Sequence, residues 1–352
     1  MRAVRHVEQL AAYALADLGG QRRTLAQNES AYPPSPLAIA AGHAALENAA
    51  LYPDPDWTEL RAAIAAQHGL DPATILCGTG SMDLISCTIR AFAGPGREVL
   101  APRYGYLFAA TATAQADATY VTVDEARGMV DVDGLLRAVT PATAMVFLCN
   151  PGNPTGTRIP SREILRLRDG LPASVLLVVD QAYGEFDDQD HRAVFGLVAR
   201  GDTVVLRTFS KAYGLAGVRI GWGVFPPEVG REVRKLQNSN DVTVIALAMA
   251  AAAMRDQLHM RDVVARTAAT RAIFAEGLTA AGYAVLPSHT NFVMVRLADR
   301  GEADRAHAAL LGAGLIARQL GGYGLADSLR ITIGLPEEMQ AALAVLTGLA
   351  PR

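Results

Sequence analysis

The chain has 352 residues, of which 51% are hydrophobic and 19% are charged, and its formal net charge is −3. This composition is typical of a folded α/β protein with a large core, and it argues against disorder. No basic tract is present, so nucleic acid is a poor candidate partner. The longest apolar run, Val242–Met254, is shorter than the roughly 18 residues that span a bilayer. With no apolar leader at the N-terminus, we expect a cytoplasmic protein without membrane association.

The cysteines and histidines suggest no metal or disulfide framework. Cys77, Cys87 and Cys149 are scattered and form no CxxC pair. The seven histidines show no metal-binding spacing, so no metal site is expected. The length exceeds what one hydrophobic core commonly holds, which predicts a large domain with a smaller one.

The first part of the chain predicts helices on either side of an extended arm. Helical spacing runs to about Gly20, and the prolines between residues 33 and 36 then fix an extended path. This arm is either an inert linker or a contributor to a site. A helix is expected over residues 36–48. Asp56 and Glu59 resemble a capping box that opens the next helix, through Ala66.

From residue 75 onward, short apolar runs alternate with helical segments. The predicted strands are 75–77, 98–101, 119–123, 144–149, 174–179 and 203–206, and the predicted helices are 81–92, 106–114, 132–138 and 161–168. Nearly continuous apolar strands that alternate with helices predict a mostly parallel sheet covered on both faces. Ligands in such α/β folds collect at the carboxyl ends of the strands.

The last third of the chain predicts a smaller α+β domain. Its pattern is helical from residue 228 to about 281, and strand-like runs at 292–296 and 329–333 flank a helix near 304–311. The expected division is an N-terminal segment and arm at 1–35, a large domain at 36–240, and a small domain at 241–352.

Polar residues stand directly after several predicted strands. Packing of a buried sheet does not explain polar side chains at these positions. Gly78-Thr79-Gly80-Ser81 stands between a strand and a helix, where backbone N–H groups can bind an anion such as phosphate. The run Asn150–Gly156 is dense in Asn, Pro and Gly and is either a simple turn or part of a site. Asp180 ends a fully apolar run, where a carboxylate is costly unless it is paired. A cationic ring nitrogen would be a suitable partner, and a surface ion pair or a helix cap is the alternative.

Lys211 follows the last of these strands, among small and hydroxyl residues, with Arg219 eight positions on (219 − 211). A lysine in a tight apolar setting can have a lowered pKa and form a Schiff base with a carbonyl. A solvated surface lysine is the simpler interpretation. Lys211, Asp180, an Asn-rich turn and a phosphate-type loop together are what a pyridoxal phosphate site requires.

The sequence resembles fold-type I pyridoxal phosphate aminotransferases of the class I/II group, and among them the histidinol-phosphate aminotransferases. The resemblance extends from about residue 28 to residue 334. Its specific parts are Asn150-Pro-Gly-Asn-Pro-Thr-Gly156, Asp180-Gln-Ala-Tyr183, Ser210-Lys211 with Arg219, and Leu329-Arg-Ile-Thr-Ile-Gly334. It implies a large domain with a mostly parallel sheet, a smaller α+β domain, and a homodimer with shared active sites.

The resemblance also implies roles for individual residues. Lys211 would form the aldimine with the cofactor and move the proton, and Asp180 would pair with the ring nitrogen. Asn153 and Tyr183 would bond the ring hydroxyl oxygen, and Tyr104 would stack on the ring. The phosphate would be held by Gly80, Ser81, Thr208, Ser210 and Arg219, with Met82 also at the cofactor and Tyr52 reaching the partner subunit's phosphate. Substrate would meet Arg330 through its carboxylate, Arg318 through a distal phosphate, and Tyr32 and Asn153.

The sequence departs from the family in its arm, at Ser30 and Ala31, and at Met82, where an acidic residue is usual. Gln181 stands in place of the usual Glu. None of these departures removes a residue needed for the Lys211 aldimine, so we expect an aminotransferase that moves an amino group between an amino acid or amino-phosphate, histidinol phosphate-like or aromatic, and a 2-oxo acid. A decarboxylase of a phosphorylated amino acid and a non-catalytic protein that binds pyridoxal phosphate are the alternatives.

Overall fold

A seven-stranded sheet forms the centre of the larger part of this computed structural model, which describes residues 2–8, 10 and 24–349. The strand order is β1-β7-β6-β5-β4-β2-β3. The strands are β1 (Ile75–Gly78), β2 (Glu98–Pro102), β3 (Thr119–Val123), β4 (Thr143–Cys149), β5 (Leu176–Asp180), β6 (Thr203–Thr208) and β7 (Gly221–Val224). Strands β2 to β6 pair in parallel, and β7 runs antiparallel to both β1 and β6. The predicted mostly parallel α/β sheet is confirmed.

Strand β7 has no counterpart among the predicted strands. Its sequence, Gly-Trp-Gly-Val, contains two glycines, which have low strand propensity. Gly223 is needed for packing, because a Cβ there would lie 2.7 Å from a methyl carbon of Leu206 and from the ring of Phe225. The glycines therefore let β7 pair closely between β1 and β6.

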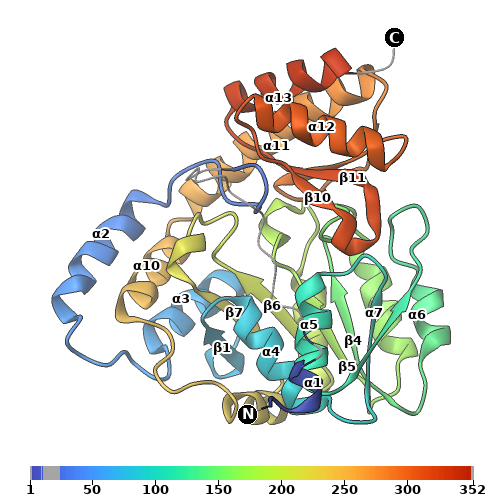
Figure 1. Cartoon of the computed structure of the whole chain (residues 1–352). Helices are drawn as coiled ribbons and strands as arrows, with labels where there is room; N and C mark the ends of the chain where they lie inside the picture. Colours follow the sequence, from blue (N-terminus) through green and yellow to red (C-terminus); the bar gives the residue numbers. More distant parts are fainter. Residues whose placement is uncertain (1, 9, 11–23, 350–352) are drawn as a thin grey trace.

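Helices cover the sheet on both sides (Figure 1). They are α4 (Ser81–Phe92), α5 (Leu107–Gln115), α6 (Val132–Ala138), α7 (Ser161–Gly170), α8 (Arg192–Gly196) and α9 (Pro227–Arg234). The core between them is apolar, and every residue of β4, β5 and β6 is buried. Burying strands on both faces explains why their sequences are almost continuously hydrophobic.

Helix α3 (Thr58–His68) does not begin with the predicted capping box. Trp57 occupies the N-cap position with a left-handed φ of 53° and makes no capping hydrogen bond from its side chain. The Asp54 carboxylate instead accepts hydrogen bonds from the N–H groups of Asp56 and Thr58, at 2.9 and 2.7 Å. The expectation for Asp56 and Glu59 was wrong because the earlier aspartate satisfies these donors.

A second, smaller sheet has the order β10-β11-β9-β8 and its own apolar core. The strands are β8 (Ala284–Val285), β9 (Phe292–Arg296), β10 (Arg318–Leu320) and β11 (Leu325–Thr332), and the helices are α11 (Gln257–Ala280), α12 (Arg300–Gly312) and α13 (Pro336–Leu349). Figure 1 shows these elements gathered beyond one edge of the large sheet. Helix α10 (Val244–Arg255) packs against α2 (Pro36–Ala45) in the larger core. We therefore propose that the boundary between the two domains lies at the α10–α11 junction and not at residue 240.

The arm runs between the two sheets. Leu25 forms a bridge with Ala317, and its carbonyl accepts a hydrogen bond from the Thr332 N–H at 2.8 Å. Most of the first predicted helix, up to Gly20, lies outside the described residues, which include α1 (Arg5–Glu8). In the described ranges, no helix is both long enough and apolar enough to cross a membrane.

Candidate active site

A cavity of about 700 Å³ lies where the large sheet, the small sheet and the arm meet. The carboxyl ends of β4, β5 and β6 form its floor through Cys149, Asp180 and Thr208. Eleven of the residues expected at the site line it: Ser81, Met82, Asn153, Asp180, Tyr183, Thr208, Ser210, Lys211, Arg219, Arg318 and Arg330. The structure therefore brings together residues that lie up to 249 positions (330 − 81) apart in the chain.

Lys211 is held by the arm. Its Nζ donates hydrogen bonds to the backbone carbonyls of Gln27 and Asn28, at 3.2 and 3.0 Å. Burial of the amine, followed by the positive charge of Arg330, lowers the pKa of Lys211 to about 7. Much of this amine is therefore uncharged at neutral pH, and only an uncharged amine attacks a carbonyl.

Asp180 is the last residue of β5, and the residue is 2% exposed. One carboxylate oxygen accepts a hydrogen bond from the Ala182 N–H at 3.1 Å. Burial raises the pKa of Asp180 to about 7, against the effects of that hydrogen bond and of the charges on Lys211 and Arg207. A buried carboxylate in this state gains from a cation placed against it, such as a protonated ring nitrogen.

Asn28 connects the arm to both domains. Its side-chain amide donates to the Tyr183 hydroxyl oxygen at 2.8 Å, and its carbonyl oxygen accepts from the Thr332 hydroxyl at 3.1 Å. Its backbone has a φ of 56°, in the left-handed region that asparagine tolerates better than most residues. The Asn291 amide in turn donates to the Asn28 backbone oxygen at 3.0 Å. The arm is therefore part of the site and not an inert linker.

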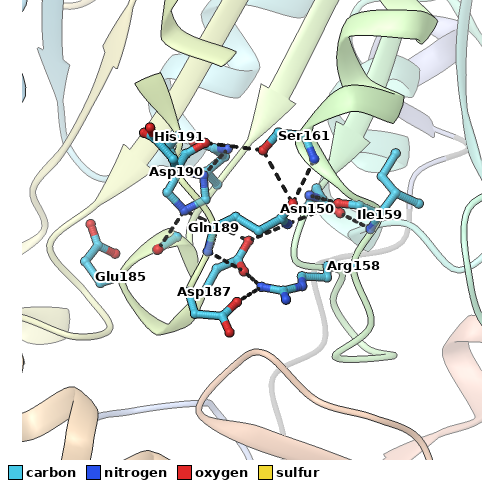
Figure 2. Close-up of polar contacts among 12 residues, drawn as sticks. Asn150, Arg158, Ile159, Ser161, Glu185, Asp187, Gln189, Asp190 and His191 are labelled. Atoms are coloured by element: carbon cyan, nitrogen blue, oxygen red, sulfur yellow. Dashed lines mark hydrogen bonds and ion pairs between the residues drawn. The ribbon is translucent and has the colours of Figure 1, made fainter. Parts of the chain in front are cut away.

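The turn after β4 is braced by the turn after β5 (Figure 2). The Asn150 side chain forms hydrogen bonds with both backbone groups of Ile159, at 3.1 and 2.8 Å. The Gln189 side chain accepts from the Ser161 N–H at 2.8 Å and donates to the Ile159 carbonyl at 3.3 Å. These contacts fix the loop that carries Asn153 into the cavity.

The Gly80–Ser81 turn, the end of β6 and Arg219 form a cradle of hydrogen-bond donors. Ser81 is the first residue of α4, so its end of the helix presents free N–H groups. Arg219 lies beside this turn, because a Cβ at Gly80 would lie 2.7 Å from its guanidinium. The same guanidinium donates to the Ser210 hydroxyl at 3.5 Å. Backbone N–H groups, a helix N-terminus and an arginine make an arrangement that binds phosphate.

Arg318 and Arg330 lie opposite each other in register on β10 and β11, and both line the cavity. Arg330 donates to the Asn153 side-chain oxygen and to the Ala26 carbonyl, both at 2.6 Å. Its Nε is buried and has no hydrogen-bond partner among the described residues. The two guanidinium groups give this end of the cavity a capacity for anions.

Four expected site residues lie away from the cavity wall. Gly80 is the N-cap residue of α4 and lies beside the Arg219 guanidinium. Tyr104 packs in a cluster with Met294, Leu320 and Leu325. Tyr52 is 88% exposed, and Tyr32 lies under the Arg266 guanidinium at 3.9 Å. None of the four is among the residues that line the described cavity.

Other lining residues had no predicted role. Tyr106, two positions after Tyr104, supplies an aromatic side chain at the start of α5, and Tyr323 comes from the Gly-rich turn before β11. Gln27, Asn28 and Glu29 bring the arm to the wall. The second tyrosine of the Tyr-Gly-Tyr motif was the signal for Tyr106, while nothing in the local sequence distinguishes Tyr323.

Comparisons with known proteins agree with this geometry. The family model for aminotransferase class I and II matches residues 23–346. Histidinol-phosphate aminotransferase of Ruegeria pomeroyi is 42% identical over 310 residues, which cover 88% of this chain and 86% of that protein. The corresponding enzyme of Paramagnetospirillum magneticum is 43% identical over 329 residues, which cover 92% of this chain and 90% of its own.

Solved structures of aminotransferases share the whole architecture. Histidinol-phosphate aminotransferase from Sinorhizobium meliloti, in complex with pyridoxal-5'-phosphate, matches with a TM-score of 0.92 and 30% identity over 99% of this chain and 97% of its own. N-Succinyldiaminopimelate aminotransferase from Mycobacterium tuberculosis matches with a TM-score of 0.83 and 27% identity over 93% of each chain. The chain therefore belongs to the class I and II aminotransferases and is a pyridoxal phosphate-dependent transaminase of fold type I.

Proposed function

We propose that this enzyme transfers the amino group of histidinol phosphate, or of a closely related amino-phosphate, to a 2-oxo acid. The observation that carries the proposal is the pair Arg318 and Arg330, which face one cavity from adjacent strands. Arg330 is suited to the carboxylate of the 2-oxo acid, and Arg318 to the phosphate of the donor. The relatives named histidinol-phosphate aminotransferase support this choice of donor.

The residues of the cavity fit pyridoxal phosphate. The cradle formed by Ser81, Ser210 and Arg219 suits its phosphate, and the buried Asp180 carboxylate suits its ring nitrogen. Asn153 and Tyr183 present an amide and a hydroxyl toward the same space, where the ring hydroxyl would lie. For the aromatic side chain against the ring, we propose Tyr106 in place of Tyr104, because Tyr106 lines the cavity.

The bound cofactor supplies an aldehyde and a conjugated ring that accepts electrons from the substrate. Lys211 would hold the cofactor through its amine, and the same Nζ would take a proton from the substrate carbon and later give it up. The Asp180 carboxylate would favour the cationic form of the ring nitrogen, the form in which the ring accepts electrons better. Arg330 fixes the substrate so that the carbon to be deprotonated faces Lys211.

We also propose a homodimer and a cytoplasmic location. Leu46, Leu51 and Tyr52 are exposed hydrophobic residues of the large domain, and their exposed fractions of 54%, 66% and 88% favour an interface. Tyr52 lies away from its own cavity, so a role at a phosphate requires a second copy. The free state of Cys77, Cys87 and Cys149 supports a reducing compartment.

An amino-donor panel with 2-oxoglutarate tests the substrate. We expect histidinol phosphate to give a higher kcat/KM than histidinol, phenylalanine or tyrosine. Arg318→Gln should raise the KM for histidinol phosphate by about 10- to 100-fold, the loss of one charge-assisted contact, with little change for histidinol. The exposed Arg300 provides a control through Arg300→Gln. An equal response of both donors to Arg318→Gln would contradict the role of Arg318, and carbon dioxide release from a phosphorylated amino acid without an oxo acid would favour decarboxylation.

A further inference from the structure

A buried ion pair lies beside the strand end that carries Asp180. Arg207 on β6 donates to Glu185, on the turn after β5, with 3.1 Å between Nη1 and Oε1. The side chains are 3% and 4% exposed. Figure 2 shows Glu185 on the same segment as Asp187 and His191, near the braced turn. Neither member of the pair lines the cavity, so contact with substrate does not account for it.

The chain is shaped to admit the Arg207 side chain. A Cβ at Gly184 would collide with the guanidinium, so glycine is required at this turn. The guanidinium also lies 5.4 Å from the centre of the Phe195 ring, at a distance suited to a cation–π contact. Burying two charges costs free energy that their attraction only partly offsets, so stability alone is a weak reason for such a pair.

Arg207 acts on Asp180 from the neighbouring strand. In the sheet, Asp180 is paired with Leu206, and Arg207 is the next residue. Burial raises the pKa of Asp180, while the Ala182 N–H, Lys211 and Arg207 favour the ionised carboxylate. Glu185 lies beside the guanidinium, where burial raises its own pKa and Arg207 opposes this rise.

Beyond the ion pair of Arg158 with Asp187, which lies on the far side of His191, the neighbouring histidines, cysteine and tyrosines carry little charge. Burial, followed by the charge of Arg207, lowers the pKa of His191 to about 4 and that of His68 to about 3, so both rings are neutral at neutral pH. Burial also raises the pKa values of the groups that carry negative charge only when deprotonated, which are Cys149, Tyr183 and Tyr213. The cations that act on Asp180 are therefore Lys211 and Arg207.

These two cations differ in the pH range over which they stay protonated. The Lys211 amine must be neutral to bind an aldehyde, and its pKa is already lowered to about 7. A guanidinium remains protonated at every pH at which a protein is folded. When Lys211 is neutral, Arg207 is the cation that still favours an ionised Asp180.

We propose that Arg207, held in place by Glu185, is a positioning residue that keeps the Asp180 carboxylate ionised against the cofactor ring nitrogen while Lys211 is neutral. This inference rests on the proposed role of Asp180 at that nitrogen. It assigns a role to a buried ion pair that does not line the cavity.

The test uses holoenzyme loaded with pyridoxal phosphate that is isotopically labelled at the ring nitrogen. Nitrogen NMR reports the protonation of the ring, and equilibrium dialysis gives the cofactor Kd. In Arg207→Met, we expect the signal to move toward the unprotonated value and the Kd to rise about tenfold, which corresponds to a change of about one in the pKa of a single group. Arg207→Lys retains the charge and should remain close to wild type.

Glu185→Gln tests the other member of the ion pair and removes its negative charge instead of the positive one. It keeps a hydrogen-bond acceptor for Arg207 but removes the negative charge, so the ring signal should stay at the protonated end and the Kd should not rise. Arg168→Met is the matched control, because Arg168 is 0% exposed and donates to the backbone carbonyls of Val175 and Leu171 at 2.7 and 2.8 Å. It should lower the melting temperature without moving the signal.

The outcomes separate this inference from the proposed function. Equal signals in Arg207→Met and Arg168→Met, or equal changes in Arg207→Lys and Arg207→Met, would overturn the inference. If Arg207→Met does not fold, Arg207→Gln replaces it, because glutamine keeps a hydrogen-bond donor for Glu185 but carries no charge; the same shift of the ring signal is expected, and a wild-type signal would overturn the inference. Asp180→Ala should abolish the protonated signal. If it does not, the role of Asp180 itself is wrong, which is a failure of the proposed function.

Discussion

Arg330, on β11, donates a 2.6 Å hydrogen bond to the side-chain oxygen of Asn153, in the turn after β4, although the two residues are 177 positions apart. This bond joins the small domain to the loop that carries Asn153. It also fixes the plane of the guanidinium, which a carboxylate needs for a bidentate contact.

Arg330→Lys should raise the KM for the 2-oxo acid by about 10- to 100-fold, because a lysine cannot replace two parallel hydrogen bonds. Steady-state kinetics with 2-oxoglutarate measure this effect. Arg296→Lys is the control, because Arg296 lies on the adjacent β9 but is exposed and paired with Asp327 at 2.8 Å. An unchanged KM in Arg330→Lys would remove Arg330 from the carboxylate site.

Capture of pyridoxal phosphate by the apoenzyme should depend on pH with a midpoint near 7. The reactive form of Lys211 is the uncharged amine, and the lowered pKa of about 7 makes this form abundant well below the usual range of a lysine. The rate of cofactor uptake should therefore rise with pH through 7 and level off by about pH 8. Stopped-flow absorbance measures it, and a rise that continues toward pH 10 would show that Lys211 titrates as an exposed lysine.

The free energy of unfolding of the apoenzyme should depend on pH through the titration of Asp180. Its pKa is about 7 when folded and 3.8 as the ordinary value, so the folded protein binds an extra proton between these limits. This contribution to stability is complete below pH 4 and is lost as the pH rises through 7. Wild-type apoenzyme should therefore lose on the order of 2–4 kcal/mol between pH 5 and pH 8 relative to Asp180→Asn.

Urea unfolding at the two pH values measures that difference. Asp190→Asn is the control: the Arg192 side chain lowers the pKa of Asp190 to about 2, so the residue does not titrate between pH 5 and pH 8. Addition of pyridoxal phosphate should abolish the difference, because the cationic ring pairs with the ionised carboxylate. Parallel pH profiles for wild type and Asp180→Asn would be inconsistent with a buried titrating carboxyl.

Gly221→Ala should weaken cofactor binding without unfolding the protein. A Cβ at Gly221 would collide with the Ser81 backbone N and approach the Gly80 carbonyl carbon to 2.7 Å, so the cradle must shift. We expect the Kd for pyridoxal phosphate to rise at least about tenfold, the loss of one good phosphate contact. Gly196→Ala is the control, because nothing lies within 4 Å of a Cβ there. An unaltered Kd in Gly221→Ala would show that the cradle tolerates displacement.

Local sequence was sufficient to locate the residues at strand ends. Asp180 and Lys211 follow apolar runs, and the topology of a parallel sheet places such positions on one edge. The predicted strands that surround them are confirmed. Strand β7 was missed because its glycines lower strand propensity, and the space they leave for Leu206 and Phe225 is visible only in three dimensions.

Contacts between segments that are distant in sequence could not be predicted from local sequence patterns. The pair of Arg207 and Glu185 needs the register of β6 and the turn after β5, and neither segment by itself marks a site. The choice between Tyr104 and Tyr106 depends on where α5 begins, which is after Tyr106. The capping of α3 by Asp54 depends on the left-handed backbone at Trp57, which sequence did not indicate.

The contact between the arm and β11 determines when the active site can be completed during translation. The Asn28 N–H donates to the Thr332 hydroxyl at 3.0 Å across 304 positions of chain. The carbonyls of this arm hold Lys211, and the charge of Arg330 helps to lower its pKa. A nascent chain that ends before β11 has the lysine and the arm, but it lacks Thr332, which binds the arm, and Arg330. Because the N-terminal part folds first on the ribosome, the reactive amine is activated only when translation is almost complete.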